Sequence, residues 1–400
     1  RVPDIHRRFE SVRLFVPQTL VVTTDAFDAF VAENDLKRFA TRSESDETAA
    51  EAFGRAAFPA AVADDLRAYL NRIRYPLAVR SSSLLEDAKV RAYAGLYRTC
   101  MLPNDHPSLD VRLRQLIEAV KLIYASTYFQ NPRAFSHRVG HRIEEEKMAV
   151  IVQKLVGRRH GRHFYPSISG AAQSYNYYPF GAMRPEDGIA TIALGLGRTV
   201  MEGEKALRFC PRHPQLLPQR STVKDILANS QRFFYSLRMD GSYAAPGLRE
   251  DAVLEKREVV DVPEDPDVRA LSGYYLPREE RIREAFDPAG TPVLTFSQVL
   301  KYDLFPLPQL LADVLAMGQD GMGCPVELEF AVDLPPAAGE PPGFALLQLR
   351  PMTSKAENVQ VTIGPEEETR AFCSSSQALG NGEKEDLADI VFVKPDAFEV

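Results

Sequence analysis

Two stretches near the end of the sequence decide the fold: PVELEFAVD (residues 325–333) and FALLQLRPM (residues 344–352). Both contain short runs of apolar, β-forming residues, so each is predicted to be a strand that enters a core. Side chains two residues apart on a strand point to the same face. If the two strands pair, they bring together four polar side chains: Glu327, Glu329, Gln348 and Arg350.

This set of side chains fits a site for magnesium and a polyphosphate. Carboxylate and amide oxygens suit a hard cation, and a guanidinium is a fork for phosphate oxygens. The same residues also fit a solvent-facing sheet surface with a salt bridge. The hairpin alone leaves both interpretations open, so the rest of the chain has to separate them.

Length and composition describe an ordinary globular protein. The 400 residues exceed one usual core, so we expect two or three domains or subdomains. The chain is 45% hydrophobic and 26% charged, and no apolar run approaches the roughly 18 residues of a membrane span. A net charge of −7 argues against nonspecific nucleic-acid binding as the main function.

The cysteines bear on the cellular compartment, and the first residues bear on whether the chain is a fragment. Cys100, Cys210, Cys324 and Cys373 are far apart and lack C-x-x-C spacing, which favours thiols in a reducing cytoplasm over disulfides or a zinc site. The opening RVPDIHRRFESVRLF has no initiator Met and no apolar signal core. We therefore expect a cytoplasmic protein of which this chain is a fragment.

Periodicity outlines the elements before the hairpin. LFVPQTLVVTTDAFDAFVAENDL (14–36) predicts a strand followed by an amphipathic helix, and EEKMAVIVQKLV (145–156) predicts an apolar strand with one polar residue, Gln153. Helices are predicted over residues 48–73, 110–135, 221–238 and 304–318. The polar tail after Arg350 contains one clear strand, IVFVKPD (390–396).

Three upstream stretches carry residue types that bind phosphate. In YPLAVRSSS (75–83) a strand delivers Arg80 to its end and breaks into serines, which fits a phosphate cradle or a polar turn. The second stretch is GRRHGRHFYPSISGAAQSYNYYPFG (157–181), whose Arg- and His-rich start fits phosphate contacts or a solvated turn. Because His160 and His163 lack Cys or acidic partners at ligand spacing, we expect no metal there. GLGRTV (195–200) fits phosphate binding or a tight turn.

Taken together, these stretches resemble the N-terminal ATP-grasp domain of the phosphoenolpyruvate synthase and pyruvate phosphate dikinase family. The resemblance is carried in family order by FVPQTLVVTTDAF, LAVRSSSLLEDAKVRAYAGLYRT, MAVIVQKLV, LGLGRTVMEGE, and the pair VELEFAVD and LLQLRPM. It implies an α+β, ATP-grasp fold with two α+β subdomains enclosing a nucleotide cleft. We expect subdomains at residues 1–188 and 189–352, with a linker and the start of another domain at 353–400.

The family pattern also implies ATP and Mg²⁺ as cofactors and assigns roles to single residues. Arg80 on the triphosphate and Arg350 beside the γ-phosphate are the expected catalytic residues. Metal and phosphate ligands are expected at Glu329 and Gln348, helped by Glu327, which replaces the usual Asp. Further nucleotide contacts are expected from four residues. Gly95 and Thr99 would lie in the turn over the nucleotide, Arg133 near the phosphates and Gln153 on the adenine-side strand.

The chain departs from the family pattern in three places. Nothing in RVPDIHRRFESVRL matches the phosphate-binding Lys that relatives carry upstream of FVP. GRHFYPSISGAAQSYNYY (161–178) replaces the SGV-F loop that caps the phosphates. None of the seven histidines lies in a Thr-x-His phosphocarrier motif.

The resemblance therefore implies an ATP-dependent phosphotransferase domain that donates to a histidine on a separate swivelling domain outside this fragment, for later transfer to pyruvate. Expected partners are ATP and that histidine domain, with no nucleic acid and no membrane. Two alternatives stay open. One is a phosphotransferase with another acceptor, as in antibiotic phosphotransferases and glucan dikinases, and the other is a degenerate nucleotide-sensing module.

Overall fold

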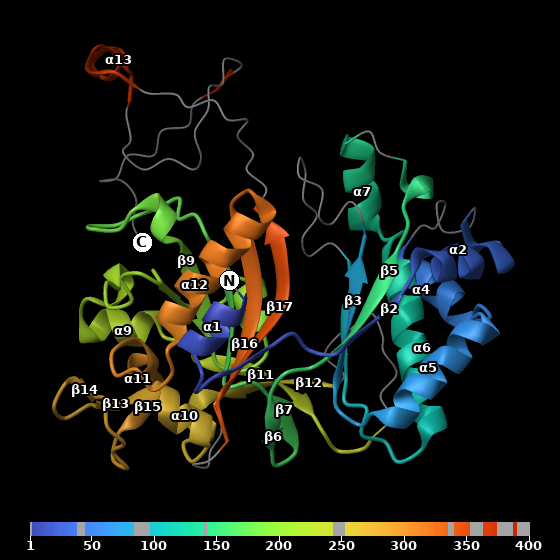
Figure 1. Cartoon of the computed structure of the whole chain (residues 1–400), viewed down its shortest axis with the longest axis horizontal. Coiled ribbons are helices and arrows are strands. Elements are labelled where there is room, and N and C mark those ends of the chain that lie inside the picture. The colour runs from blue at the N-terminus through green and yellow to red at the C-terminus, as the bar shows by residue number, and fades with distance from the viewer. Residues whose placement is uncertain are drawn as a thin grey trace.

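The computed structural model describes residues 2–37, 45–83, 97–139, 142–242, 253–334, 340–352, 363–373 and 387–389. Figure 1 shows two bodies side by side, each with helices and sheets, which confirms the expected α+β fold of two subdomains. The α-helices are α1 (Val2–Arg8), α2 (Thr24–Glu33), α4 (Asp46–Arg55), α5 (Ala60–Arg72), α6 (Leu109–Ser126), α7 (Gln130–Val139), α8 (Arg198–Met201), α9 (Val223–Asn229), α10 (Pro266–Leu271), α11 (Ser297–Leu300), α12 (Leu307–Met322) and α13 (Pro365–Arg370).

Seventeen strands form four sheets within the described residues. They are β1 (Arg13–Phe15), β2 (Thr19–Val22), β3 (Leu77–Ser82), β4 (Thr99–Leu102), β5 (Ala149–Lys154), β6 (Arg158–His160), β7 (His163–Tyr165), β8 (Ile168–Gln173), β9 (Ile189–Ala193), β10 (Leu207–Phe209), β11 (Phe233–Arg238), β12 (Leu254–Glu258), β13 (Ser272–Leu276), β14 (Arg281–Arg283), β15 (Thr291–Leu294), β16 (Val326–Asp333) and β17 (Gly343–Pro351). Short 3₁₀ turns are η1 (Ile143–Glu145), η2 (Pro185–Asp187), η3 (Pro218–Arg220) and η5 (Val259–Asp261).

The first subdomain is an antiparallel sheet in the order β2-β5-β3-β4, covered on one side by helices α2, α4, α5 and α6 (Figure 1). Helix α6 buries Leu116, Val120 and Ile123, whose spacing of four and three residues puts them on one helix face. On β3, Leu77 and Val79 belong to the same core. Because side chains alternate along a strand, Ala78 and Arg80 lie on the opposite face, which the helices leave uncovered.

The second subdomain is built on a six-stranded sheet in the order β1-β17-β16-β8-β9-β10. Its pairs are antiparallel except that β1 runs parallel to β17. Helix α12 packs closely on one face, where a Cβ on Gly318 would lie 3.1 Å from Leu349 and 3.2 Å from Val326. Two smaller sheets, β12-β11-β7-β6 and β14-β13-β15, complete this subdomain.

The two largest hydrophobic cores show where the chain crosses between subdomains. The first core runs from Val22 to Val152, whereas the second takes Ile5, Phe9 and Val12 and resumes at Phe164. Strand β8 pairs with β16, in the middle of the second sheet. We therefore propose boundaries in the crossings after β1 and after β5, instead of the expected boundary at residue 188.

Most predicted elements are confirmed, but one prediction is half wrong. The helix at 304–318 and the strand at 145–156 are present with shifted ends. The helical stretches at 48–73 and 110–135 are each divided into two helices, α4 and α5 in the first and α6 and α7 in the second. The expected helix over 221–238 ends at Asn229, and Phe233–Arg238 is strand β11 instead. Pairing with β12 and β7 determines this segment, because β structure depends on neighbours more than on local propensity. The strand expected at 390–396 lies outside the described residues.

Within the described residues, Cys100 and Cys210 are buried, Cys324 is half-buried and Cys373 is exposed, and none of the four forms a disulfide. Among the helices described, none is long and apolar enough to cross a membrane.

Candidate functional site

Strands β16 and β17 form the antiparallel hairpin predicted from the sequence, with the four polar side chains on one face. Glu327 is opposite Arg350 and Glu329 is opposite Gln348. Between the two glutamates, Leu328 is buried against the core under α12. The polar face is therefore the one that α12 does not cover.

Arg80 joins this hairpin to the other subdomain. Its Nη2 donates to Glu329 Oε2 at 3.0 Å and to Gln348 Oε1 at 2.9 Å. The Arg80 side chain is 23% exposed and that of Glu329 is 14% exposed, so the ion pair is largely shielded from water. The uncovered face of the β3 sheet and the polar face of the β16–β17 hairpin therefore meet at Arg80.

Glu327 is held by two neighbours on its own sheet. Arg350 Nη2 lies 2.5 Å from Glu327 Oε1, and Gln173 Nε2 donates to Glu327 Oε2 at 2.7 Å. Gln173 is opposite Glu327 on β8, so the two side chains share a face. Sequence reasoning missed Gln173. Its only signal was its place at the end of the strand-like ISGAAQ, in the segment that departs from the family pattern.

Two more predicted residues share the face of the first sheet that carries Arg80. Thr99 is directly opposite Arg80 on β4. Gln153 is opposite Ala78 on β5, and it is buried with Nε2 donating to Thr19 Oγ1 at 3.2 Å. Directly opposed residues point to the same side of a sheet, so both face the second subdomain together with Arg80.

The remaining predicted residues are placed less fully. Arg133 lies half-buried on helix α7, and its role in the site stays a prediction. Gly95 lies outside the described residues.

The glycine-rich GLGRTV stretch forms a tight turn. Gly195 has φ +87°, a conformation that favours glycine, and a Cβ there would lie 2.7 Å from the Tyr235 carbonyl oxygen. The turn itself therefore explains the glycine at position 195, which fits the tight turn rather than the phosphate-binding interpretation of this stretch.

His160 and His163 lack acidic partners at ligand spacing in the sequence, but the fold supplies one for each. His160 Nδ1 lies 3.0 Å from Asp265 Oδ2, and His163 Nε2 lies 3.1 Å from Glu255 Oε2. These partners come from β12 and the N-cap of α10, about a hundred residues later in the chain. A search by local ligand spacing cannot find partners that only the tertiary fold brings together.

The Arg80–Glu329 contact gives a prediction for stability without any ligand. Arg80→Met should lower the free energy of unfolding by about 1–2 kcal/mol, because it leaves the shielded Glu329 carboxylate without this partner. Urea denaturation followed by circular dichroism measures the change. The matched control is Arg55→Met, which removes the ion pair between Arg55 and Glu51. These side chains are 81% and 66% exposed, so the control should lower the free energy of unfolding by less than about 0.5 kcal/mol. Equal losses in the two variants would contradict the prediction.

Comparison with protein families gives a match that covers most of the chain. The family model described as the AMP/ATP-binding domain of pyruvate phosphate dikinase matches residues 5–370. That range includes both subdomains and every residue of the site described above. No curated protein matches the chain.

Proposed function

Because the chain belongs to the family of the pyruvate phosphate dikinase AMP/ATP-binding domain, we propose that it binds Mg-ATP between the β2-β5-β3-β4 sheet and the β16–β17 hairpin and donates a phosphoryl group. The acceptor in this proposal is a histidine on a separate swivelling domain, from which the group passes to pyruvate. One observation carries the proposal. Arg80 of the first subdomain converges on Glu329 and Gln348 of the second, so charged groups from both subdomains gather at one place.

The donor set at this place fits a hard cation. Glu327, Glu329 and Gln348 present oxygen atoms from one strand pair, and such ligands are what Mg²⁺ prefers. When bound, the cation would neutralise charge on the phosphates during transfer. In the structure the Arg80 guanidinium provides a counter-charge to Glu329, which supports the assignment of Glu329 as a ligand for a cation.

The arginines supply positive charge for the phosphates. Phosphoryl transfer needs positioning and charge neutralisation more than covalent chemistry from the protein. Arg350 is oriented by Glu327, which is itself held by Gln173, so the guanidinium is positioned before a ligand arrives. We assign Arg80 to the triphosphate and Arg350 to the transferred group, with Gln153 and Thr99 on the opposite sheet toward the nucleoside.

Isothermal titration calorimetry of the folded chain with ATP tests the binding step. We expect saturable heat in the presence of MgCl₂ and much weaker binding when EDTA removes the metal. A folded chain that shows no heat with Mg-ATP would refute the proposal.

The transfer step needs a separate experiment. The chain is incubated with γ-³²P-labelled ATP and a histidine-bearing domain, and the label is tested for the acid lability and base stability of phosphohistidine. Transfer to this domain supports the proposed acceptor. Tight Mg-ATP binding without transfer to any protein would instead indicate a nucleotide-sensing module or an acceptor of another class.

A further inference from the structure

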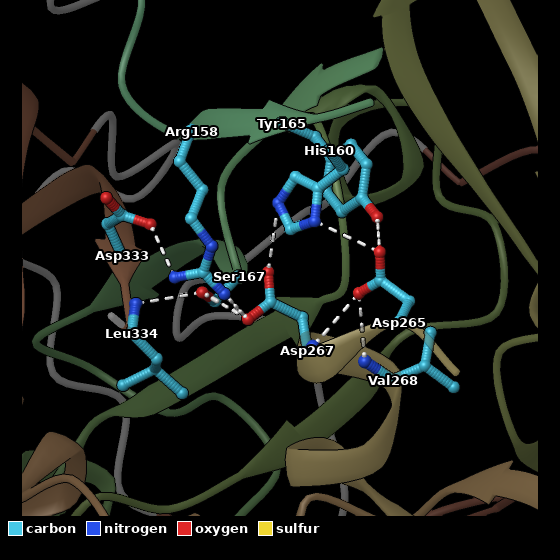
Figure 2. A network of polar contacts seen from close by, with 9 residues as sticks. All are labelled: Arg158, His160, Tyr165, Ser167, Asp265, Asp267, Val268, Asp333 and Leu334. Atoms are coloured by element: carbon cyan, nitrogen blue, oxygen red, sulfur yellow. Dashed lines mark hydrogen bonds and ion pairs between the residues drawn. The ribbon is translucent and has the colours of Figure 1, made fainter. Parts of the chain in front are cut away.

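A second cluster of charged side chains lies inside the second subdomain, away from the β16–β17 site residues. Figure 2 shows His160 on β6 between Asp265 and Asp267, which come from the N-cap and the first turn of α10. Their side chains are 7%, 10% and 1% exposed, respectively. The His160 ring stacks on Tyr165 with centroids 3.9 Å apart and an interplanar angle of 11°, which fixes its plane.

Each of the two carboxylates has one oxygen held by other donors and one oxygen turned toward His160. Asp265 Oδ1 accepts from the backbone N–H groups of Asp267 at 2.9 Å and Val268 at 3.4 Å. Asp265 Oδ2 accepts from the Tyr165 hydroxyl at 2.5 Å and lies 3.0 Å from His160 Nδ1.

Asp267 repeats this arrangement. Its Oδ1 accepts from Arg158 and from Ser167 Oγ, the latter at 2.9 Å, while its Oδ2 lies 3.4 Å from His160 Nε2. Arg158 also binds Asp333, and Figure 2 shows it approaching Asp267 from the side away from His160. The guanidinium therefore anchors the outer oxygen of Asp267 and leaves the inner oxygen to His160.

Two buried atoms in this cluster have no hydrogen bond. His160 Nε2 and Asp267 Oδ2 are both shielded from water and lack a hydrogen-bond partner in the part of the chain that the structure describes. Three carboxylates, of Asp265, Asp267 and Asp333, face a single arginine and one imidazole. With a neutral imidazole the cluster has a net negative charge, and burying such charge without compensation is costly.

We propose that His160, Asp265 and Asp267 bind a divalent transition-metal ion such as Zn²⁺. Each residue offers one ligand atom, and these atoms lie within 4.8 Å of one another. His160 can bind the ion through only one ring nitrogen, and its Nε2 lies 3.4 Å from Asp267 Oδ2, a separation that fits two atoms sharing an ion at bond lengths of about 2.1 Å. An imidazole among the ligands favours zinc or a similar ion over Mg²⁺, which takes oxygen ligands.

The hydrogen bonds to the two carboxylates would act as the outer shell of this metal site. Such contacts orient ligands before the metal arrives, and their role here falls to Tyr165, Ser167 and Arg158. The ion would tie β6, the first strand after the second crossing between subdomains, to helix α10. A buried site with these connections is of the structural type, and it is separate from the Mg-ATP site.

The test uses the whole chain, stripped with a chelator, dialysed and titrated with ZnCl₂, with bound zinc measured by mass spectrometry. We expect about one equivalent of zinc in the wild type and at least about tenfold weaker binding in His160→Gln and Asp267→Asn. His163→Gln is the matched control, because His163 lies on the same hairpin but pairs with Glu255 on the surface. Glu329→Gln should keep its zinc, which separates this site from the Mg-ATP site.

Three outcomes would overturn the proposal. They are a wild-type chain that takes up no zinc, equal losses in His160→Gln and His163→Gln, and loss of zinc in Glu329→Gln with retention in Asp267→Asn. If the His160 and Asp267 variants fail to fold, Co²⁺ replaces Zn²⁺ in the wild type. X-ray absorption should then show one nitrogen ligand with oxygen ligands, and a spectrum of oxygen ligands alone would refute the assignment.

Discussion

Glu329→Gln should bind Mg-ATP about 30- to 100-fold more weakly than the wild-type chain. The amide has nearly the shape of the carboxylate but lacks its charge, so the variant removes attraction for the cation without opening a cavity. Two opposite unit charges about 4 Å apart near a protein surface attract each other by about 4 kcal/mol. We expect the variant to lose half or more of this attraction for the cation, which is about 2–3 kcal/mol. Each 1.4 kcal/mol is about tenfold in affinity. Isothermal titration calorimetry with MgCl₂ present measures the loss.

Two controls show whether the loss belongs to the metal. Binding of ATP with EDTA present should differ much less between the variant and the wild type, because Glu329 then has no cation to hold. Glu51→Gln removes a carboxylate that is 66% exposed on helix α4 and should leave Mg-ATP affinity unchanged. Unchanged Mg-ATP affinity in a folded Glu329→Gln chain would remove Glu329 from the proposed ligands.

The alternation of side chains along each strand of the hairpin was enough to predict which of them share a face. A strand repeats every two residues, so Glu327 and Glu329 had to lie together wherever the strand was placed. The register was harder, because the pairing slips by one residue between Glu329 and Phe330. Such a bulge depends on how neighbouring side chains pack, and local sequence does not encode it.

Contacts between distant segments could not be derived from spacing. Arg80 and Glu329 are separated by 249 positions, and only the family resemblance placed them in one site. Gln173 was missed because no motif marks it, although strand pairing sets it opposite Glu327. The same limitation hid the acidic partners of His160, since α10 reaches β6 only through the tertiary fold.

Gly170→Ala should lower the free energy of unfolding by about 3 kcal/mol, a large loss of stability for a single added methyl group. Gly170 lies on β8 opposite Phe330, and a Cβ there would be 2.4 Å from Phe330 Cζ and 2.8 Å from the Thr191 carbonyl oxygen. Phe330 cannot move away easily, because it is fully buried and stacks on Phe344 with centroids 5.3 Å apart. Urea denaturation of both proteins measures the difference.

The substitution should also weaken Mg-ATP binding in the fraction that stays folded, because Phe330 directly follows Glu329 at the bulge of β16. Gly54→Ala is the matched control, since the helix α4 position has no atom within 4 Å of the added Cβ. Alanine is favoured over glycine in a helix by about 0.5–1 kcal/mol, so this variant should be as stable as the wild type or more stable. Unfolding of Gly170→Ala and Gly54→Ala at the same urea concentration would contradict the prediction, because it would mean that β8 tolerates a side chain at position 170. The close approach of β8 to β16 would then not be what holds Glu329 in place.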